Sequence, residues 1–216
     1  MTIRTLFLNC TLKQSPETSN TQSLIDKVAA LFAERDVECE SIRVVDYDVK
    51  AGISSDEGAG DQWPHILERV MASDILVIAM PIWFGQRSSI AQRVMERLDG
   101  TYAEADPHTG QFPLYGKVAG VIVTGNEDGA HDCCANTLYN LTHLGCMVPP
   151  NVDCYWVGDA GPGPSYVEAG GDKHLYTNRT ARYMMHNLLW GVSALAATPI
   201  GTDLKQLDAE AKIASA

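Results

Sequence analysis

The stretch Ile3-Arg4-Thr5-Leu6-Phe7-Leu8 and the residues after it, Asn9-Cys10-Thr11-Leu12-Lys13-Gln14-Ser15-Pro16-Glu17-Thr18-Ser19-Asn20-Thr21, decide how the chain begins to fold. The first six residues have the length and apolar composition of a β-strand. Apolar residues then return with helical spacing at Leu24, Val28, Leu31 and Phe32. The sequence therefore predicts a strand that leads into a helix through a loop rich in hydroxyl groups.

This loop has the donors of a phosphate site. The start of a helix exposes unpaired backbone N–H groups and a partial positive charge. Neutral side-chain donors come from Thr11, Ser15, Thr18, Ser19, Asn20 and Thr21. Because the same residue types also serve as ordinary N-caps and turn residues, the loop by itself leaves both interpretations open.

The composition predicts one folded domain whose net charge disfavours binding to polyanions. The chain has 216 residues, of which 45% are apolar, enough to bury a full core. Its 16 basic and 27 acidic residues give a formal charge of -11, which disfavours a broad electrostatic contact with nucleic acid or anionic lipid. The N-terminus lacks a signal-peptide pattern, and no segment approaches the length of a membrane span. We therefore expect a cytoplasmic protein with no nucleic-acid partner and no membrane insertion.

The cysteines predict packing rather than metal binding. The six residues are Cys10, Cys39, Cys133, Cys134, Cys146 and Cys154. They form no CxxC pair and no Cys/His array with zinc-ligand spacing. A redox pair at Cys133 and Cys134 is the weaker alternative, since neighbours in a helix point in different directions. We expect reduced thiols and no metal site.

Five apolar segments alternate with helical patterns along the chain. The predicted strands are residues 3–8, 40–45, 75–79, 117–124 and 151–157, and helical spacing follows at 24–32, 63–71, 91–98, 134–144 and 175–195. Parallel neighbours need helical crossovers, so this alternation predicts an α/β fold: a doubly wound, five-stranded parallel sheet with helices on both faces. A flavodoxin-like strand order, 2-1-3-4-5, fits best. We expect one domain over residues 1–200 and a polar surface or subunit-contact tail over 201–216.

In such a sheet, ligands bind outside the carboxyl ends of the strands, between the first and third strands. The third strand ends in Met80-Pro81-Ile82-Trp83-Phe84-Gly85, where we expect Pro81 and Gly85 to fix a bend. Trp83 and Phe84 lie where the chain should leave the core, a position that suits a flat heteroaromatic ligand. For either ring taken alone, packing beneath a helix is the favoured alternative.

The fourth strand ends in Thr124-Gly125-Asn126-Glu127-Asp128-Gly129-Ala130-His131. The glycines let the backbone approach a ligand closely, and the polar side chains offer hydrogen bonds. A tight turn followed by an N-cap explains this loop alone about equally well. The three loops together give a phosphate end, a planar apolar slot and a polar edge, which is the outline of a flavin mononucleotide (FMN).

From about Thr2 to Leu195, the chain resembles the NADPH-dependent FMN reductase branch of the flavodoxin-like superfamily. Cys10-Thr11-Leu12-Lys13 stands where the family has Gly-Ser-Pro/Leu-Arg/Lys, and Ser19-Asn20-Thr21 matches the end of its phosphate loop. The loop after the third strand, Pro81-Ile82-Trp83-Phe84-Gly85, is similar to the family's Pro-x-Tyr/Trp-x-Gly flavin loop. The helix that follows ends in Arg97-Leu98-Asp99, which is similar to the family's usual helix ending near Asp-Arg. Cys10 departs from the usual Gly. The cysteine cluster of the related iron–sulfur flavoproteins is absent, so we expect no iron.

The resemblance implies FMN as cofactor, NAD(P)H as electron donor, and a quinone, free flavin or similar small acceptor. The cofactor-binding residues indicated are Thr11, Lys13, Ser19, Asn20, Thr21, Pro81, Ile82, Trp83, Phe84, Gly85, Thr124, Gly125, Asn126, Glu127 and Gly129. Flavin chemistry requires no catalytic side chain, although His131 could bond the ring or a substrate. We expect a homodimer or homotetramer.

Other functions fit less well. A non-catalytic FMN electron carrier of the flavodoxin type is the main alternative, and the acidic charge permits it. Against it, Gly158 to Gly171 and the long helix after this segment exceed the needs of a minimal carrier. The glycine pattern at 158–163 is not a dinucleotide fingerprint, because those glycines belong after the first strand. We expect a mobile flap here, with residues 158–166 walling an acceptor pocket.

Overall fold

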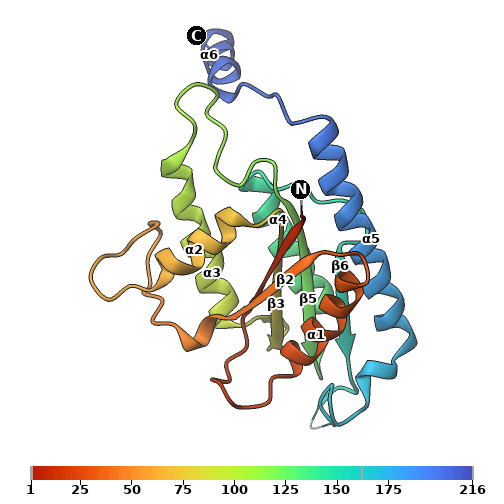
Figure 1. The fold of residues 1–216 in the computed structure, drawn as a ribbon. Coiled ribbons are helices and arrows are strands. Elements are labelled where there is room, and N and C mark those ends of the chain that lie inside the picture. The colour runs from red at the N-terminus through yellow and green to blue at the C-terminus, as the bar shows by residue number, and fades with distance from the viewer. Residues whose placement is uncertain (1, 162, 216) are drawn as a thin grey trace.

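The computed structural model describes residues 2–161 and 163–215. Three residues of the predicted parts therefore lie outside the described residues: Met1 of the domain, Pro162 of the flap within that domain, and Ala216 of the tail. Five parallel strands form the sheet, namely β1 (Arg4–Asn9), β2 (Glu38–Arg43), β3 (Ile75–Trp83), β5 (Val118–Gly125) and β6 (Asp153–Val157). Their order is β2-β1-β3-β5-β6 (Figure 1), which confirms the flavodoxin-like order.

Helices cover both faces of the sheet, as expected. The helices α1 (Asn20–Ala33) and α5 (Leu175–Ala197) pack on one face, while α2 (Trp63–Ala72), α3 (Ser89–Asp99) and α4 (Ala130–His143) pack on the other. Short 3₁₀ helices, η1 (Val44–Asp46), η2 (Gly100–Glu104) and η3 (Gly171–Lys173), occur in the connections. A last helix, α6 (Leu204–Ala214), follows α5.

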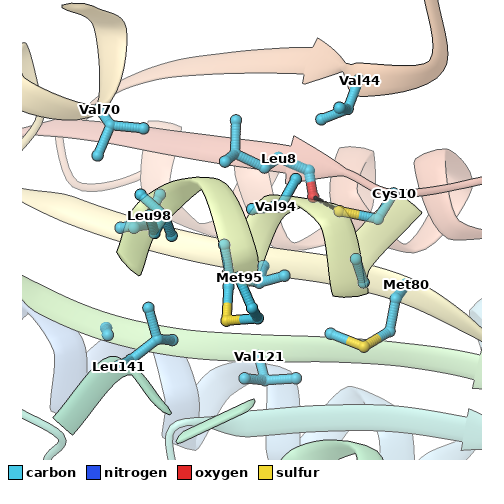
Figure 2. Packing of buried hydrophobic residues seen from close by; sticks show 14 of the residues in the cluster. Leu8, Cys10, Val44, Val70, Met80, Val94, Met95, Leu98, Val121 and Leu141 are labelled. Carbon is cyan, nitrogen blue, oxygen red and sulfur yellow. Dashed lines mark hydrogen bonds between the residues drawn. The ribbon is translucent and has the colours of Figure 1, made fainter. Parts of the chain in front are cut away.

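Alternating side chains of each strand build two separate cores. Leu76, Ile78 and Met80 of β3 point toward α2, α3 and α4, whereas Ile75, Val77 and Ala79 point toward α1 and α5. Figure 2 shows the first of these cores, in which Leu8 and Val121 pack around Val94, Met95 and Leu98 of α3. This two-faced burial is why β3 is an unbroken apolar run.

The end of β3 differs from the expected bend at Pro81. The strand continues to Trp83, and a two-residue strand β4 (Gln86–Arg87) turns back antiparallel to it, pairing Trp83 with Gln86. Proline has no backbone N–H to donate to a neighbouring strand. Pro81 is tolerated in β3 because the pairing with β1 ends at Ala79, so no hydrogen bond to β1 is needed at residue 81. The chain reverses at Phe84 and Gly85, which have φ values of 50° and 74°.

A buried ion pair holds the Gly-rich connection between η1 and α2. Arg97 Nη2 of α3 lies 2.7 Å from Asp61 Oδ2, and both side chains are fully buried. The Arg97 guanidinium also donates to the carbonyls of Ser54 and Lys50 and lies over the Trp63 ring. Residues 50–61 are thus attached to α3 although they contain no regular element.

The tail contains a helix that has no buried residue among those described. Figure 1 shows α6 beyond the end of the sheet, at the loop after η2. Gln111 Nε2 donates to the carbonyls of Ile200 and Thr202, and the Leu204 N–H donates to the Thr109 carbonyl. None of the helices described is long and apolar enough to cross a membrane.

Candidate functional site

A cleft of about 470 Å³ opens at the carboxyl ends of β1, β3, β5 and β6, the switch point expected for this strand order. Its walls come from the loops that follow these four strands. The lining residues are Thr11, Leu12, Lys13, Asn20, Thr21, Pro81, Ile82, Trp83, Thr124, Gly125, Asn126, Glu127, Trp156, Gly161 and Tyr166.

Asn9, at the end of β1, organises the first loop. Its side chain is fully buried; Oδ1 accepts the Thr11 N–H at 3.1 Å, and Nδ2 donates to Gln22 Oε1 at 2.8 Å. Ser88 donates its hydroxyl to the Cys10 carbonyl at 2.6 Å, which attaches the loop to the start of α3. Asn9 and the start of α3 therefore hold the loop in place without a ligand.

Cys10, which replaces the usual Gly of the family loop, is a packing residue. Its side chain is fully buried in the core between the sheet and α3, and its thiol lies 3.5 Å from the Leu8 carbonyl. Burial raises the pKa of this thiol far above its ordinary value, although the positive charge of Arg87 opposes the shift. A thiol in this state is a poor nucleophile.

The start of α1 offers neutral donors to the cleft. Among the described residues, the backbone N–H groups of Asn20 and Thr21 donate to no atom. Thr21 Oγ1 lies 2.9 Å from Thr124 Oγ1, so the first turn of α1 meets the end of β5. Ser19 does not line the cleft; it is the N-cap, and its Oγ accepts the Gln22 N–H at 3.1 Å.

The hairpin between β3 and β4 borders the open side of the cleft. Trp83 is 50% exposed and Phe84 is 93% exposed, so neither ring packs beneath a helix. The Phe84 N–H donates to Glu127 Oε1 at 2.9 Å, and this bond connects the hairpin to the loop after β5. Phe84, Gly85 and Gly129 support this edge without lining the cleft.

Two buried aromatic residues line the inner wall: Trp156, which the loop analysis did not select, and Tyr166, the last residue of the segment 158–166 that was expected to wall an acceptor pocket. Their rings meet edge to face, with centroids 5.5 Å apart. The segment after β6 is attached to the loop after β5, because Asn126 Nδ2 donates to the carbonyls of Gly163 and Pro164. The sequence did carry a signal for Trp156, because it is an aromatic residue near the carboxyl end of the last predicted strand, residues 151–157, which is β6 in the structure.

His131 is positioned outside the cleft lining. Its Nε2 lies 2.9 Å from the Tyr155 hydroxyl, which in turn donates to the Tyr176 hydroxyl at 3.0 Å. Burial and the bond to Tyr176 both raise the pKa of the Tyr155 phenol. This chain of polar groups connects α4, β6 and the first turn of α5.

The donor set of the cleft fits FMN. Hydroxyl and N–H groups at the start of α1 suit a phosphate, Ile82 and the aromatic residues suit a planar ring, and Asn126 and Glu127 offer polar contacts to a ring edge. A separate hollow of about 560 Å³ over β1, β2 and α2 is lined by charged residues that already pair with each other, including Arg69 with Glu40 at 2.6 Å.

The comparisons with known proteins identify the family of the chain. The family model for NADPH-dependent FMN reductases matches residues 3–159. The 8-demethyl-8-aminoriboflavin-5'-phosphate synthase of Streptomyces davaonensis is 43% identical over 214 residues, covering 95% of this chain and 83% of that protein.

Solved structures extend the comparison. RosB with the bound intermediate 8-demethyl-8-formylriboflavin-5'-phosphate superposes with a TM-score of 0.93 and 41% identity, over 99% of this chain and 88% of that one. The apo form of the NADH:FMN oxidoreductase EMOB has a TM-score of 0.60 and 19% identity over 94% of each chain, a likeness of fold alone. By its sequence match and its fold, the chain belongs to the NADPH-dependent FMN reductase family.

Proposed function

We propose that the chain is an FMN-dependent oxidoreductase that takes electrons from NAD(P)H and passes them to a quinone, free flavin or similar small acceptor. The observation that carries this proposal is the convergence of four loops on one cleft, with neutral donors at the start of α1 and apolar and aromatic groups at the β3 end. Bound FMN would supply the redox chemistry, acceptance of a hydride and transfer of two electrons to the acceptor.

In this proposal, the residues of the chain bind and orient FMN and exclude water from the site. The N–H groups of Asn20 and Thr21, together with the hydroxyls of Thr11 and Thr21, hold the phosphate. Lys13 is exposed at the same end of the cleft and adds a positive charge. Trp83, Ile82 and Glu127 border the ring, and the segment 158–166 covers one wall, so that a nicotinamide or acceptor is sheltered from water during transfer.

The visible spectrum tests this function. Purified protein loaded with FMN should be yellow and should bleach within the mixing time of a stopped-flow instrument when NADPH or NADH is added without oxygen. Reoxidation by a quinone then measures turnover. A protein that binds FMN but bleaches only when a second protein is added supports the carrier alternative.

A second candidate function follows from one observation, the 43% identity to a synthase that is named for a modified riboflavin phosphate. In that case FMN is the substrate, and chemistry takes place on the ring itself. Incubation of the protein with FMN in air, followed by mass spectrometry of the extracted flavin, separates the two candidates. An unchanged flavin mass after many NADPH turnovers supports the reductase, and a new flavin mass supports the second candidate.

The assembly and location remain predictions. A homodimer or homotetramer would give the acceptor pocket a further wall, and sedimentation velocity of the full chain tests it. The cytoplasmic location stays a prediction from the sequence. The division into a domain over 1–200 and a tail over 201–216 is likewise proposed, and removal of residues 201–216 should leave FMN binding intact.

A further inference from the structure

A hollow of about 460 Å³ lies between β4 and the first turns of α3 and α4. It is lined by Gln86, Arg87, Ser89, Gln92, Cys133 and Asn136. Among these described residues Arg87 is the charged one and none is acidic, although the chain contains 27 Asp and Glu residues. A hollow with one arginine and no carboxylate favours an anionic ligand.

The positive charge of Arg87 is not compensated by the chain. Arg87 is half-buried, and it forms no ion pair with any described residue. Its Nε donates to Gln92 Oε1 at 2.8 Å and its Nη1 donates to Asn140 Oδ1 at 2.7 Å, so both partners are neutral amides. Burial lowers the pKa of Arg87, and the surrounding negative groups offset this shift only in part. An anion in the hollow would stabilise this charge.

The two amides hold the guanidinium in one orientation. Gln92 Nε2 donates to Glu96 Oε1 at 2.8 Å, which turns Gln92 Oε1 toward Arg87 and keeps the Glu96 carboxylate engaged. A guanidinium has five N–H donors, and the bonds to Gln92 and Asn140 use two of them. The donors that remain form part of a planar fork, which matches the oxygens of a phosphate.

The walls of the hollow continue from the walls of the cleft. In the hairpin, Phe84 stands between Trp83, which lines the cleft, and Gln86, which lines the hollow and pairs with Trp83. On the other wall, α4 begins directly after the loop whose Glu127 lines the cleft. The bond from the Phe84 N–H to Glu127 joins these two walls. An extended ligand that starts at the open side of the cleft would cross this bond to reach Arg87.

We propose that the hollow binds the ribose phosphate by which NADPH differs from NADH, and that Arg87 selects NADPH as the electron donor. This inference rests on the proposed function and adds the choice of nucleotide, which the cleft residues leave open. An arginine near the ribose accommodates this phosphate in dinucleotide sites, whereas an acidic residue there bonds the free ribose hydroxyl of NADH. The hollow has the arginine and, among its described lining residues, lacks the acid.

Two nucleotide fragments test the inference without redox chemistry. The adenosine bisphosphate half of NADPH and the adenosine monophosphate half of NADH differ only in the phosphate concerned. Calorimetric titration of the protein in the presence of FMN measures their dissociation constants. We expect the wild type to bind the bisphosphate more tightly. For Arg87→Gln we expect the bisphosphate to bind about tenfold more weakly, the loss typical of a hydrogen bond to a charged group, and the monophosphate to bind as before.

A second variant keeps the test independent of the bonds that Arg87 makes within the chain. Ser89 is exposed and is the first residue of α3, where a carboxylate interacts favourably with the helix dipole, so Ser89→Glu should fold. Its negative charge should repel the bisphosphate at least as strongly as Arg87→Gln weakens it. Arg93→Gln is the matched control: it removes a positive charge from α3 that donates to the Val49 carbonyl outside the hollow, and both affinities should stay unchanged.

The other outcomes contradict the inference in distinct ways. Equal weakening of both fragments in Arg87→Gln overturns a contact with the ribose phosphate. Inorganic phosphate that displaces the bisphosphate at equal concentration assigns the hollow to a free anion and overturns the selection of NADPH. Unchanged bisphosphate affinity in Arg87→Gln and Ser89→Glu removes the hollow from the nucleotide site, while bleaching of the flavin by NADPH still supports the proposed function. FMN-loaded protein that bleaches with neither nucleotide overturns the proposed function together with this inference.

Discussion

Thr21 Oγ1 and Thr124 Oγ1 lie 2.9 Å apart and join the first turn of α1 to the carboxyl end of β5. Two loops separated by 103 residues thereby share one hydrogen bond inside the cleft. Both hydroxyls also retain capacity for a ligand, since a hydroxyl is one donor and can accept twice. In the proposed FMN site, the phosphate end and the ring end of the cleft therefore meet at this contact.

Replacing Thr21 with Ala should weaken FMN binding and leave riboflavin binding unchanged. The lost hydrogen bond to a charged phosphate corresponds to about 1.5–3 kcal/mol. Titration of the apoprotein with each flavin gives the two dissociation constants. Thr21→Ser, which keeps the hydroxyl, is the matched control and should bind FMN like the wild type; equal FMN affinity in all three proteins would remove Thr21 from the site.

Replacing Ser19 with Ala should act on stability instead. Because the Ser19 Oγ caps α1 by accepting the Gln22 N–H, its loss should lower the free energy of unfolding of the apoprotein by about 1 kcal/mol. Urea denaturation measures this change. Ser23→Ala removes a hydroxyl one turn later that bonds only the Ser19 carbonyl, and its effect should be smaller. A cap role is refuted if Ser19→Ala is as stable as the wild type.

Replacing Trp83 with Ala should weaken FMN and riboflavin by the same factor. A ring-to-ring contact contributes about 1 kcal/mol beyond area burial and does not involve the phosphate. The ratio of the two dissociation constants therefore separates Trp83 from Thr21. Trp190, 57% exposed on α5, provides the control, because Trp190→Ala should alter neither constant. Loss of FMN affinity alone in Trp83→Ala would contradict a place beside the ring.

Replacing Asn126 with Ala should loosen the segment 158–166. Its Nδ2 donates to the carbonyls of Gly163 and Pro164, at 2.7 and 2.9 Å, so both bonds disappear together. We expect faster proteolytic cleavage within this segment and faster release of FMN. Asn136→Ala removes an amide that bonds only the Asp132 carbonyl on α4 and is the control. Cleavage at the wild-type rate would show that other contacts hold the segment.

The ion pair of Arg97 and Asp61 predicts a pH-dependent stability. Burial alone would raise the pKa of the Asp61 carboxyl, but bonds from Arg97 and from the N–H groups of Glu57, Trp63 and Lys50 outweigh it and hold this pKa well below its usual range. The folded state therefore binds the proton less readily than the unfolded state. The resulting stability is complete above the unfolded pKa of about 3.9 and is lost as the pH falls below it.

Asp61→Ala should accordingly destabilise the protein by about 3–5 kcal/mol at neutral pH, because it leaves a buried guanidinium unpaired. Urea denaturation at neutral pH and below pH 4 should show this deficit shrinking with acid. The exposed pair of Glu40 and Arg69 is the comparison, and Glu40→Ala should destabilise the protein far less than Asp61→Ala, because solvent screens an exposed pair. A deficit that stays constant with pH would contradict an ionised Asp61.

The parallel, doubly wound sheet was predictable from the sequence because each apolar run is followed by helical spacing, and the flavodoxin-like order was the hypothesis that fitted best. The run at Ile75 to Ala79 favours a strand covered on both faces, and such a strand lies at the centre of a doubly wound sheet. Once the order is fixed, geometry places the loops after β1, β3 and β5 at one edge. The loop residues Thr11, Thr21, Trp83 and Asn126 could therefore be selected before the structure was known.

The inner wall of the cleft was not predictable in the same way. In β6 the side chains alternate, so Tyr155 and Trp156 point to opposite faces, and nothing local says which face borders the cleft. That choice depends on how the segment after β6 folds back. Contacts between residues far apart in sequence determine it, such as the bond from Val167 to Asn20. The continuation of β3 through Pro81 depends likewise on where its neighbour β1 ends.

The end of β3 and its hairpin approach the loop after β5 so closely that few substitutions fit in either segment. A Cβ at Gly125 would lie 2.8 Å from Ile82 Cδ1, and one at Gly129 would lie 2.4 Å from the Gly85 carbonyl oxygen. No side chain can be added on one loop unless the other moves. Natural variants of this chain should therefore alter the two loops together, in length or in composition, through paired substitutions rather than single ones.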